Sequence, residues 1–474
     1  MHARTRWLGV GILVLASCGA PGAGHGGAAT AAGAPAWRDP VVVLPDLLAT
    51  PLVDGAGRVV FDPGGTAASD LGARALGRAL ALPLDPRDAL RPVAPGQPHG
   101  GGAAAAAGGA RALPAARGHA ALLAALEALG YVRPAGATIG DAEAELFVFA
   151  ADWRRDPAQL AQALGRHFAE ARAVVTRRLL ARAEHLRALA QPGTVERAVE
   201  IETRVARGIR FEVFGLGTGG LLAWHYLRHG GHEFPGDPRA AGSEWAGARD
   251  IARVWFVGTP RRGTVHALRA LQEGLDLGGG RGRLGAAAVG TWPVLYALLP
   301  PPGDPAYADA AGGISAPDPF DVGLWDRNGL GLLAESADSG LADLLPTSET
   351  RADRRGRART FLSAVLARAE RVQRALDAPA AGSCPVPLIV VVGDAVPTAS
   401  AVRVATRTSG LALGFPDEAR FRAAGDGVVT VASARGFGAW PAPGPELLVV
   451  PADRAGAPGD PGFRDLLARR LLGR

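Results

Sequence analysis

Six short apolar segments that alternate with longer helix-like segments constrain the fold of this chain most strongly. The apolar segments are continuous rather than alternating with polar residues, and they comprise residues 41–45, 146–150, 211–215, 254–258, 388–393 and 446–450. Continuous runs of this length are typical of strands that are buried on both faces of a parallel sheet. Helix-like segments between them include residues 119–130, 158–190 and 221–230. The alternation predicts an α/β fold with a doubly wound, mostly parallel sheet and helices on both of its faces.

Two segments interrupt this alternation. Residues 94–117 are a low-complexity stretch rich in Ala, Gly and Pro, which predicts a surface loop. Residues 261–385 contain no convincing strand but carry several aromatic residues, so we expect a helical cap or lid inserted into the sheet domain. The predicted sheet domain therefore has a first part over residues 39–260 and a second part over residues 386–474.

The N-terminus predicts an exported bacterial lipoprotein. A short basic stretch precedes an apolar run that ends just before Cys18, and this run is shorter than the ~20 apolar residues that a membrane-spanning helix needs. Residues 15–18, Leu-Ala-Ser-Cys, resemble a bacterial lipobox, which predicts a signal peptide over residues 1–17 and a lipid on Cys18. Residues 18–38 would then tether the folded domain to a membrane of the cell envelope. An ordinary signal peptide that contains a cysteine is the alternative.

Composition argues against a nucleic-acid partner and against disulfides. All 51 basic residues are arginines, and they are interspersed with 45 acidic residues to give a net charge of +6. A protein that binds nucleic acid would gather its cations into a patch, so we predict no nucleic-acid partner. Once Cys18 is lipidated, Cys384 has no other cysteine to pair with, and stability must come from the core.

A glycine-rich run, Gly-Leu-Gly-Thr-Gly-Gly at residues 215–220, lies between an apolar segment and a helix-like segment. Its spacing matches the phosphate-binding pattern G-x-G-x-x-G, which should open the first βα unit and be followed by an acidic residue about 20 positions later. Here two predicted strands precede the run, and the next strand ends in Gly-Thr-Pro without an acid. The context favours a nucleophile turn of the type G-x-S-x-G, in which Gly217 occupies the serine position.

From about residue 40 to its C-terminus, the chain resembles the lecithin:cholesterol acyltransferase-like family of α/β hydrolases, including its bacterial lipase-like members. The similar motifs follow the family's order: VVVLPDLLATPL (41–52) for the oxyanion loop, ADWRRD (151–156), the glycine run for the elbow G-H-S-M-G-G, VGTPRRGT (257–264), WPVLYALLP (292–300) in the cap and AAGDGVVTVAS (423–433) for the acid loop. This resemblance implies an α/β-hydrolase fold and, in active members, acyl transfer by a Ser–Asp–His triad.

The same resemblance places a degraded active site on this sequence. Asp426 matches the catalytic acid, whereas Gly217 stands at the nucleophile position and Arg454 at the histidine position, and no histidine follows Asp426. The oxyanion-loop positions are Asp46 and Leu47, and Asp46 replaces a glycine of the family. A carboxylate beside donors meant for a developing anion opposes their function. Because loss of triad members typically costs ~10⁶ in turnover, we predict negligible esterase activity.

The sequence therefore predicts a lipid-anchored pseudoenzyme that binds a lipid, an acyl ligand or an envelope protein partner without catalysis. Arg454 is expected to pair with Asp426, because an unpaired buried carboxylate is costly. The alternative is an active lipase or O-acyltransferase with an unconventional nucleophile, Thr218 or Ser433, and a histidine such as His266. Thr218 follows the apex of the turn and has no evident general base, so it would be a weak nucleophile.

We predict neither a cofactor nor a metal ion. Three histidines cluster near the end of a helix-like segment, at His225, His229 and His232. They lack the carboxylate of a metalloprotease-like H-E-x-x-H pattern, so the cluster does not predict a metal site.

Overall fold

In the computed structural model, the chain from residue 38 onward folds around a six-stranded sheet. The structure describes residues 38–53, 59–64, 72–91, 114–134, 143–150, 152–234, 245–277, 282–308, 317–345, 350–379, 382–407, 410–414, 419–436 and 440–473. The predicted signal peptide, Cys18 and nearly all of the tether lie outside the described residues, as do residues 94–113 of the predicted loop.

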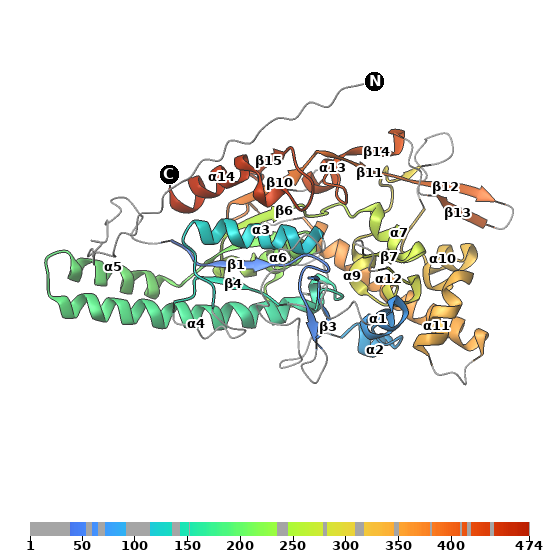
Figure 1. The fold of residues 1–474 in the computed structure, drawn as a ribbon, viewed down its shortest axis with the longest axis horizontal. Coiled ribbons are helices and arrows are strands. Elements are labelled where there is room, and N and C mark those ends of the chain that lie inside the picture. The colour runs from blue at the N-terminus through green and yellow to red at the C-terminus, as the bar shows by residue number, and fades with distance from the viewer. Residues whose placement is uncertain are drawn as a thin grey trace, which may run out of the picture. The chain divides into compact units, whose positions relative to one another are not determined.

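A central sheet of six parallel strands confirms the predicted α/β fold (Figure 1). Its strands are β1 (Val41–Leu44), β4 (Leu146–Val148), β5 (Phe211–Leu216), β6 (Ile251–Val257), β10 (Leu388–Gly393) and β15 (Glu446–Val450). They lie in the order β15-β10-β6-β5-β1-β4, and every neighbouring pair is parallel. The chain thus leaves β1 for β4 on one side and returns to the other side of β1 with β5. Parallel sheets usually bind ligands at such a reversal, beyond the carboxyl ends of the strands.

Helices cover both faces of this sheet. They are α3 (Pro114–Ala128) and α14 (Pro461–Leu472) on one face, and α4 (Pro157–Leu189) and α6 (Thr218–His229) on the other. Alternate strand residues, including Val43, Phe214 and Trp255, pack into one core with α3 and α14. On the opposite face, Phe168 of α4 packs against the ring of Phe211. The burial of successive residues on opposite faces explains why β1, β5 and β10 are almost entirely apolar. The expectation of burial on both faces is wrong for β15, an edge strand in which Leu447 and Val449 are exposed.

The chain between β6 and β10 is mainly helical, as predicted for the cap. Its helices are α7 (Val265–Glu273), α8 (Ala286–Val289), α9 (Pro293–Ala297), α10 (Val322–Asn328), α11 (Asp338–Leu344) and α12 (Arg351–Asp377). Three strands of two residues each also occur there, β7 (Leu275–Asp276), β8 (Arg283–Leu284) and β9 (Tyr307–Ala308). Strands this short leave no recognisable apolar pattern, which explains why the sequence did not predict them.

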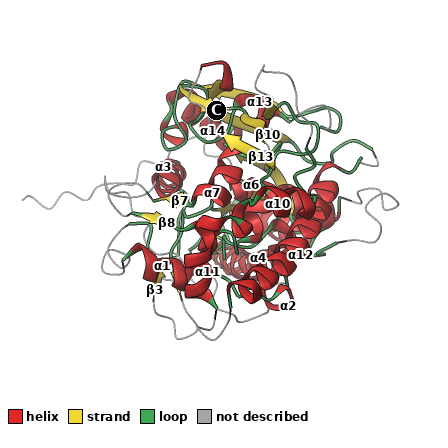
Figure 2. Cartoon of the chain, turned by 90° about the vertical axis from the view of Figure 1, so that its right-hand side faces the viewer, coloured by secondary structure: helices red, strands yellow, loops and turns green. Residues whose placement is uncertain are grey.

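Two helices that precede β4 in the chain pack against helices of the cap. Helix α1 (Ala73–Leu80) contacts α8, and α2 (Pro86–Ala89) contacts α12 (Figure 2). The cap aromatics Trp292, Tyr296 and Trp325 are fully buried. Their polar atoms have partners, since Trp292 Nε1 donates to the carbonyl oxygen of Leu80 at 2.9 Å. These aromatic side chains therefore belong to the hydrophobic core of the cap.

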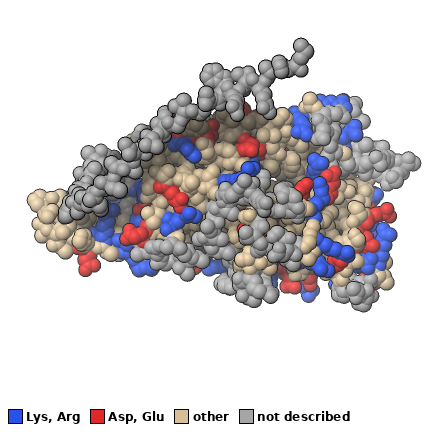
Figure 3. Space-filling model, in the orientation of Figure 1, with Lys and Arg blue, Asp and Glu red and all other residues tan. Residues whose placement is uncertain are grey.

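Short strands and helices complete the described fold. They are β2 (Leu52–Val53), β3 (Val59–Phe61), α5 (Thr194–Arg207), β11 (Val396–Ala399), β12 (Val402–Arg407), β13 (Gly410–Gly414), β14 (Arg422–Gly425) and α13 (Val431–Arg435). β11 pairs with β14, and β12 pairs with both β13 and β9. On the face drawn in Figure 3, arginine and acidic side chains are interspersed. None of the described helices combines the length and the apolar composition that crossing a bilayer requires.

Because three histidines are buried, we expect the free energy of unfolding to decrease in weak acid. Burial lowers the pKa of His119 and His167 to about 4 and that of His225 to about 3. Below pH ~6.5 these histidines bind protons in the unfolded chain but not in the folded protein. The free energy of unfolding therefore falls by up to ~1.4 kcal/mol per pH unit for each group. The free energy of unfolding should therefore decrease from pH 6.5 towards pH 4, as measured by urea unfolding. His119→Gln should reduce this slope, whereas His185→Gln, at an exposed position of α4, should not. A flat profile would contradict the expectation.

Candidate functional site

The turn at Gly217 joins β5 directly to α6. Leu216 ends the strand and Thr218 begins the helix, so Gly217 alone forms the connection. Its φ of 50° and ψ of −116° lie in a region that non-glycine residues adopt only with strain. The helix also approaches the turn after β6 closely, because a Cβ added to Gly220 would lie 1.8 Å from Thr259 Oγ1. A strained strand–turn–helix connection is the backbone geometry of a nucleophile turn.

The buried Asp46 side chain occupies two backbone donors beside this turn. Asp46 follows β1, and its Oδ1 accepts the N–H of Leu47 at 2.8 Å and the N–H of Thr218 at 2.9 Å. In proteins with a nucleophile turn, the oxyanion hole consists of the N–H that follows the nucleophile and an N–H from a neighbouring strand–helix loop. The N–H of Thr218, which follows Gly217, and the N–H of Leu47, in the loop after β1, converge on one point at this turn. The Asp46 carboxylate accepts the hydrogen bonds of both N–H groups.

Arg454, which follows β15, connects Asp46 to Asp426. Its Nε donates to Asp46 Oδ2 at 2.9 Å, and its Nη2 donates to the same oxygen. Its Nη1 donates to Asp426 Oδ2 at 3.0 Å and to the carbonyl oxygen of Gly258 at 3.0 Å. The guanidinium thus bridges two carboxylates that lie 380 positions apart in the chain, at residues 46 and 426. We call Asp46, Arg454 and Asp426 the ion triad.

Asp426 is held by its own loop as well as by Arg454. Its Oδ1 accepts the N–H of Val428 at 2.9 Å and that of Val429 at 2.7 Å. Both carboxylate oxygens therefore have donors, as a buried carboxylate requires. Burial by itself would lower the pKa of Arg454, but the carboxylates of Asp46 and Asp426 outweigh this effect and raise it. The guanidinium remains charged, and the ion triad carries a net charge of about −1 while both carboxylates are ionised.

The ion triad fills the space in which a side chain of residue 217 would lie. A Cβ atom added to Gly217 would lie 2.0 Å from Asp46 Oδ1 and 2.2 Å from Arg454 Nη2. These separations are far below ordinary van der Waals contact. A serine at this position requires Asp46 and Arg454 to move. The glycine, the aspartate and the arginine are thus sterically interdependent.

The hydroxyl groups of the alternative nucleophiles, Thr218 and Ser433, are hydrogen-bonded to other groups. The Thr218 hydroxyl lies 3.3 Å from Asp46 Oδ1 and donates to it. The Ser433 hydroxyl donates to the carbonyl oxygen of Gly263 at 2.6 Å. Burial lowers the pKa of His266, and its Nε2 is buried without a hydrogen-bond partner in the part of the chain that the structure describes. No hydrogen bond between these described residues joins either hydroxyl to His266.

The space beside Thr218 is small. A cavity of about 20 Å³ lies there, lined mainly by apolar residues that include Leu44, Phe149, Trp153 and Leu222. Such a volume accommodates about one water molecule. It does not accommodate an acyl chain.

The histidine cluster is engaged in hydrogen bonds to the backbone. His225 Nε2 lies 3.2 Å from the carbonyl oxygen of His232, and His229 Nε2 lies 3.2 Å from that of Ala375. Among the described residues, no group of three His, Cys, Asp or Glu side chains is arranged to hold a metal ion.

Comparisons with known proteins give little sequence similarity. No family model matches the chain, and no curated protein matches it. Among solved structures, a chain in the crystal structure of the Tle4–Tli4 complex is 13% identical, with a TM-score of 0.43, over 78% of this chain and 77% of that one.

Proposed function

We propose that this protein is a non-catalytic relative of lecithin:cholesterol acyltransferase-like lipases that binds a ligand at the cell envelope. In this proposal Gly217, Asp426 and Arg454 occupy the positions of the nucleophile, the acid and the histidine. Leu47 and Thr218 supply the two N–H groups of a former oxyanion hole, and Asp46 blocks it. The lipid on Cys18 would keep the protein at a membrane.

The contact of Asp46 with the N–H groups of Leu47 and Thr218 carries the proposal. Catalysis of acyl transfer requires these donors to be aimed at an oxyanion that forms only during the reaction. A carboxylate that already accepts both hydrogen bonds, at 2.8 Å and 2.9 Å, competes permanently with that oxyanion. Arg454 fixes the carboxylate in place from its other oxygen. Rotation of Asp46 out of the hole would break five hydrogen bonds to its side chain, two from backbone N–H groups, two from Arg454 and one from the Thr218 hydroxyl.

The positions of Asp46 and Gly217 in the fold support the proposal that this site descends from a ligand-binding site. Asp46 and Gly217 follow β1 and β5, between which the strand order reverses. This is the edge at which parallel α/β sheets usually hold their ligands. The ion triad fills the space beside Gly217, and the cavity that described residues line beside Thr218 measures about 20 Å³.

An activity assay tests the absence of catalysis. Purified full-length protein should neither hydrolyse short-chain nitrophenyl esters or phospholipid above background nor react with a fluorophosphonate probe. Thr218→Ala should leave this result unchanged. Turnover in the native protein that disappears in Thr218→Ala would contradict the proposal and favour an active lipase or acyltransferase.

Fractionation of cells tests the lipid anchor separately. The native protein should remain with membranes after a high-salt wash, and Cys18→Ser should release it into the soluble fraction. Retention of the Cys18→Ser variant on membranes would refute the anchoring role of Cys18 and leave the proposal about the ion triad unaffected.

A further inference from the structure

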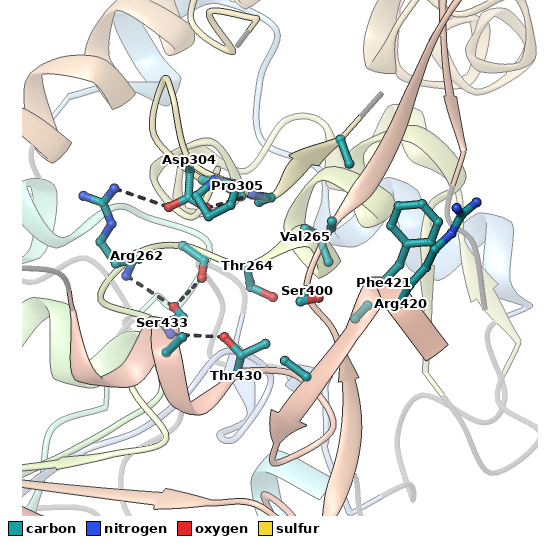
Figure 4. A pocket seen from close by; sticks show the side chains of 18 residues that line it. Arg262, Thr264, Val265, Asp304, Pro305, Ser400, Arg420, Phe421, Thr430 and Ser433 are labelled. Atoms are coloured by element: carbon teal, nitrogen blue, oxygen red, sulfur yellow. Dashed lines mark hydrogen bonds and ion pairs between the residues drawn. The ribbon is translucent and has the colours of Figure 1, made fainter. Parts of the chain in front are cut away.

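A second cavity lies apart from the ion triad, between the turn after β6, the chain that leads to β9, and the β11–β14 pair (Figure 4). Its volume is about 510 Å³, which falls within the range of roughly 300–1,000 Å³ that is typical of small-molecule sites. None of Asp46, Gly217, Asp426 and Arg454 lines it. A ligand can therefore occupy this cavity without displacing the ion triad.

The three charged side chains that line the cavity already have partners. Arg262 donates to Asp304 Oδ2 at 3.3 Å, and Asp304 Oδ1 accepts the N–H of Ala306 at 3.0 Å. The guanidinium of Arg420 lies 4.8 Å from the centre of the Phe421 ring, and both arginines have further interactions within the protein. A charged ligand group would lose its hydration here without gaining a counter-ion that lacks a partner, which is costly. The lining therefore favours a neutral ligand.

Two of the four hydroxyl groups in the lining have already donated their protons. Thr264 donates to the carbonyl oxygen of Val428 at 2.7 Å, and Ser433 donates to the carbonyl oxygen of Gly263 at 2.6 Å. A hydroxyl group has a single proton to donate. Neither of these groups can therefore donate to a ligand.

The hydroxyl protons of Ser400 and Thr430 have no acceptor in the part of the chain that the structure describes. Ser400 lies between β11 and β12, and its backbone N–H donates to the carbonyl oxygen of Phe421 at 2.9 Å, whereas its hydroxyl makes no hydrogen bond. Thr430 precedes α13, and its Oγ1 accepts the N–H of Ser433 at 3.1 Å but donates to no group. Both side chains line the cavity (Figure 4). A ligand oxygen with lone pairs would supply the missing acceptor.

The remaining wall accommodates an apolar body. It consists mainly of alanines and prolines, with Val265 and Phe421, which expose methyl, methylene and ring carbon atoms. Val265, Phe421 and the alanines of the chain leading to β9 are buried, so the apolar part of the lining extends away from the solvent. An alkyl chain gains free energy when it leaves water for such a surface.

We propose that this cavity binds a neutral carbonyl compound with an alkyl chain of medium length. The carbonyl oxygen accepts the hydroxyl proton of Ser400, and the chain lies against the alanines and Phe421. The inference rests on the proposed function in that it names the ligand of a non-catalytic binder. It moves the binding site from the blocked crevice between β1 and β5 to a cavity that the turn after β6 and the chain leading to β9 form with β11, β14 and α13.

Isothermal titration of the full-length protein with five probes tests this inference. A ketone, 2-octanone, and an amide, N-hexylacetamide, carry the carbonyl group and the chain, and neither is an ester that the protein could hydrolyse during the measurement. Octanoate and octylammonium are charged, and acetone lacks the chain. At least one of the ketone and the amide should bind roughly tenfold or more tightly than the three other probes, because the lining offers no counter-ion without a partner. Absence of binding by both, or a smaller preference, would overturn the inference.

Substitution of Ser400 tests the proposed hydrogen bond. Ser400→Ala should weaken binding of the tighter probe about two- to tenfold, which corresponds to the loss of one neutral hydrogen bond. Ser363→Ala, at an exposed position of α12, is the matched control and should leave the affinity unchanged. Unchanged affinity in Ser400→Ala would overturn the role of this hydroxyl.

A second pair of variants locates the site. Ala432→Trp places a large side chain at an exposed lining position and should abolish binding, while Ala188→Trp on the exposed surface of α4 should not. Thermal melts check that each variant is folded. Full binding by Ala432→Trp would overturn the proposed location.

Ester turnover measured on the same samples separates the two proposals. Missing binding overturns the ligand whether or not turnover occurs, and turnover overturns the non-catalytic function whether or not a probe binds. Binding without turnover supports both.

Discussion

Replacing Arg454 with methionine is expected to lower the free energy of unfolding by about 3–5 kcal/mol. The methionine fills much of the same volume but leaves Asp426 without its guanidinium partner and Asp46 with only the donors of Leu47 and Thr218. Both carboxyl groups are buried, and a buried carboxylate without a cation is strongly destabilising. Typical domains have only about 5–15 kcal/mol of stability, so the loss should be plain in urea unfolding curves.

Two further variants show whether lost charge pairing causes this effect. Arg464→Met, at an exposed position of α14, should change stability by no more than ~0.5 kcal/mol. Asp46→Asn combined with Arg454→Met should be more stable than Arg454→Met alone, because the asparagine removes one charge and can still accept the N–H groups of Leu47 and Thr218. Equal stability losses for Arg454→Met and Arg464→Met would show that the ion triad contributes nothing to stability.

Three simultaneous substitutions, Asp46→Gly, Gly217→Ser and Arg454→His, are expected to create a serine that reacts with a fluorophosphonate probe. The first substitution frees the N–H groups of Leu47 and Thr218, the second places a hydroxyl at the apex of the turn, and the third sets an imidazole beside Asp426. A serine activated by a histidine and a carboxylate reacts with such probes, whereas an unactivated serine does not. Mass spectrometry of the labelled peptide identifies the modified residue.

The single variant Gly217→Ser is the matched control. Its Cβ would meet Asp46 Oδ1 at 2.0 Å, and its backbone would adopt a conformation that costs a non-glycine residue ~1–3 kcal/mol. It should therefore be less stable than the native protein and remain unlabelled. A folded triple variant without labelling would contradict the assignment of residues 217, 426 and 454 to the positions of a triad.

The sheet could be predicted closely because its signal is local. Each apolar segment needed only to be long and continuous, and β10, expected over residues 388–393, has those bounds in the structure. The contact of α1 and α2 with cap helices could not be predicted, since packing between distant segments leaves no periodic pattern in either of them. The bounds of the two-residue strands depend on hydrogen bonds to distant partners, which the sequence does not reveal.

The candidate site could be predicted in part. The expectation that Arg454 lies beside Asp426 came from residue types, because a buried carboxylate needs a partner. The structure places these groups 3.0 Å apart. That Asp46 joins them was missed, although an acid after the first strand and a basic residue after the last gave a signal. Both strands belong to one parallel sheet, so their carboxyl ends lie at the same edge. Only the side-chain geometry shows that the Asp46 carboxylate accepts hydrogen bonds from the N–H groups of Leu47 and Thr218.

The clash that a Cβ atom at residue 217 would make has a consequence for how this sequence can change over evolutionary time. A mutation that places a serine at the turn meets Asp46 and Arg454 at once, so selection for stability would act against it. Loss of Asp46 or Arg454 alone would break the ion triad and bring no compensating gain. We therefore expect epistasis among the three positions, in that a side chain at residue 217 is tolerated only together with changes at residues 46 and 454.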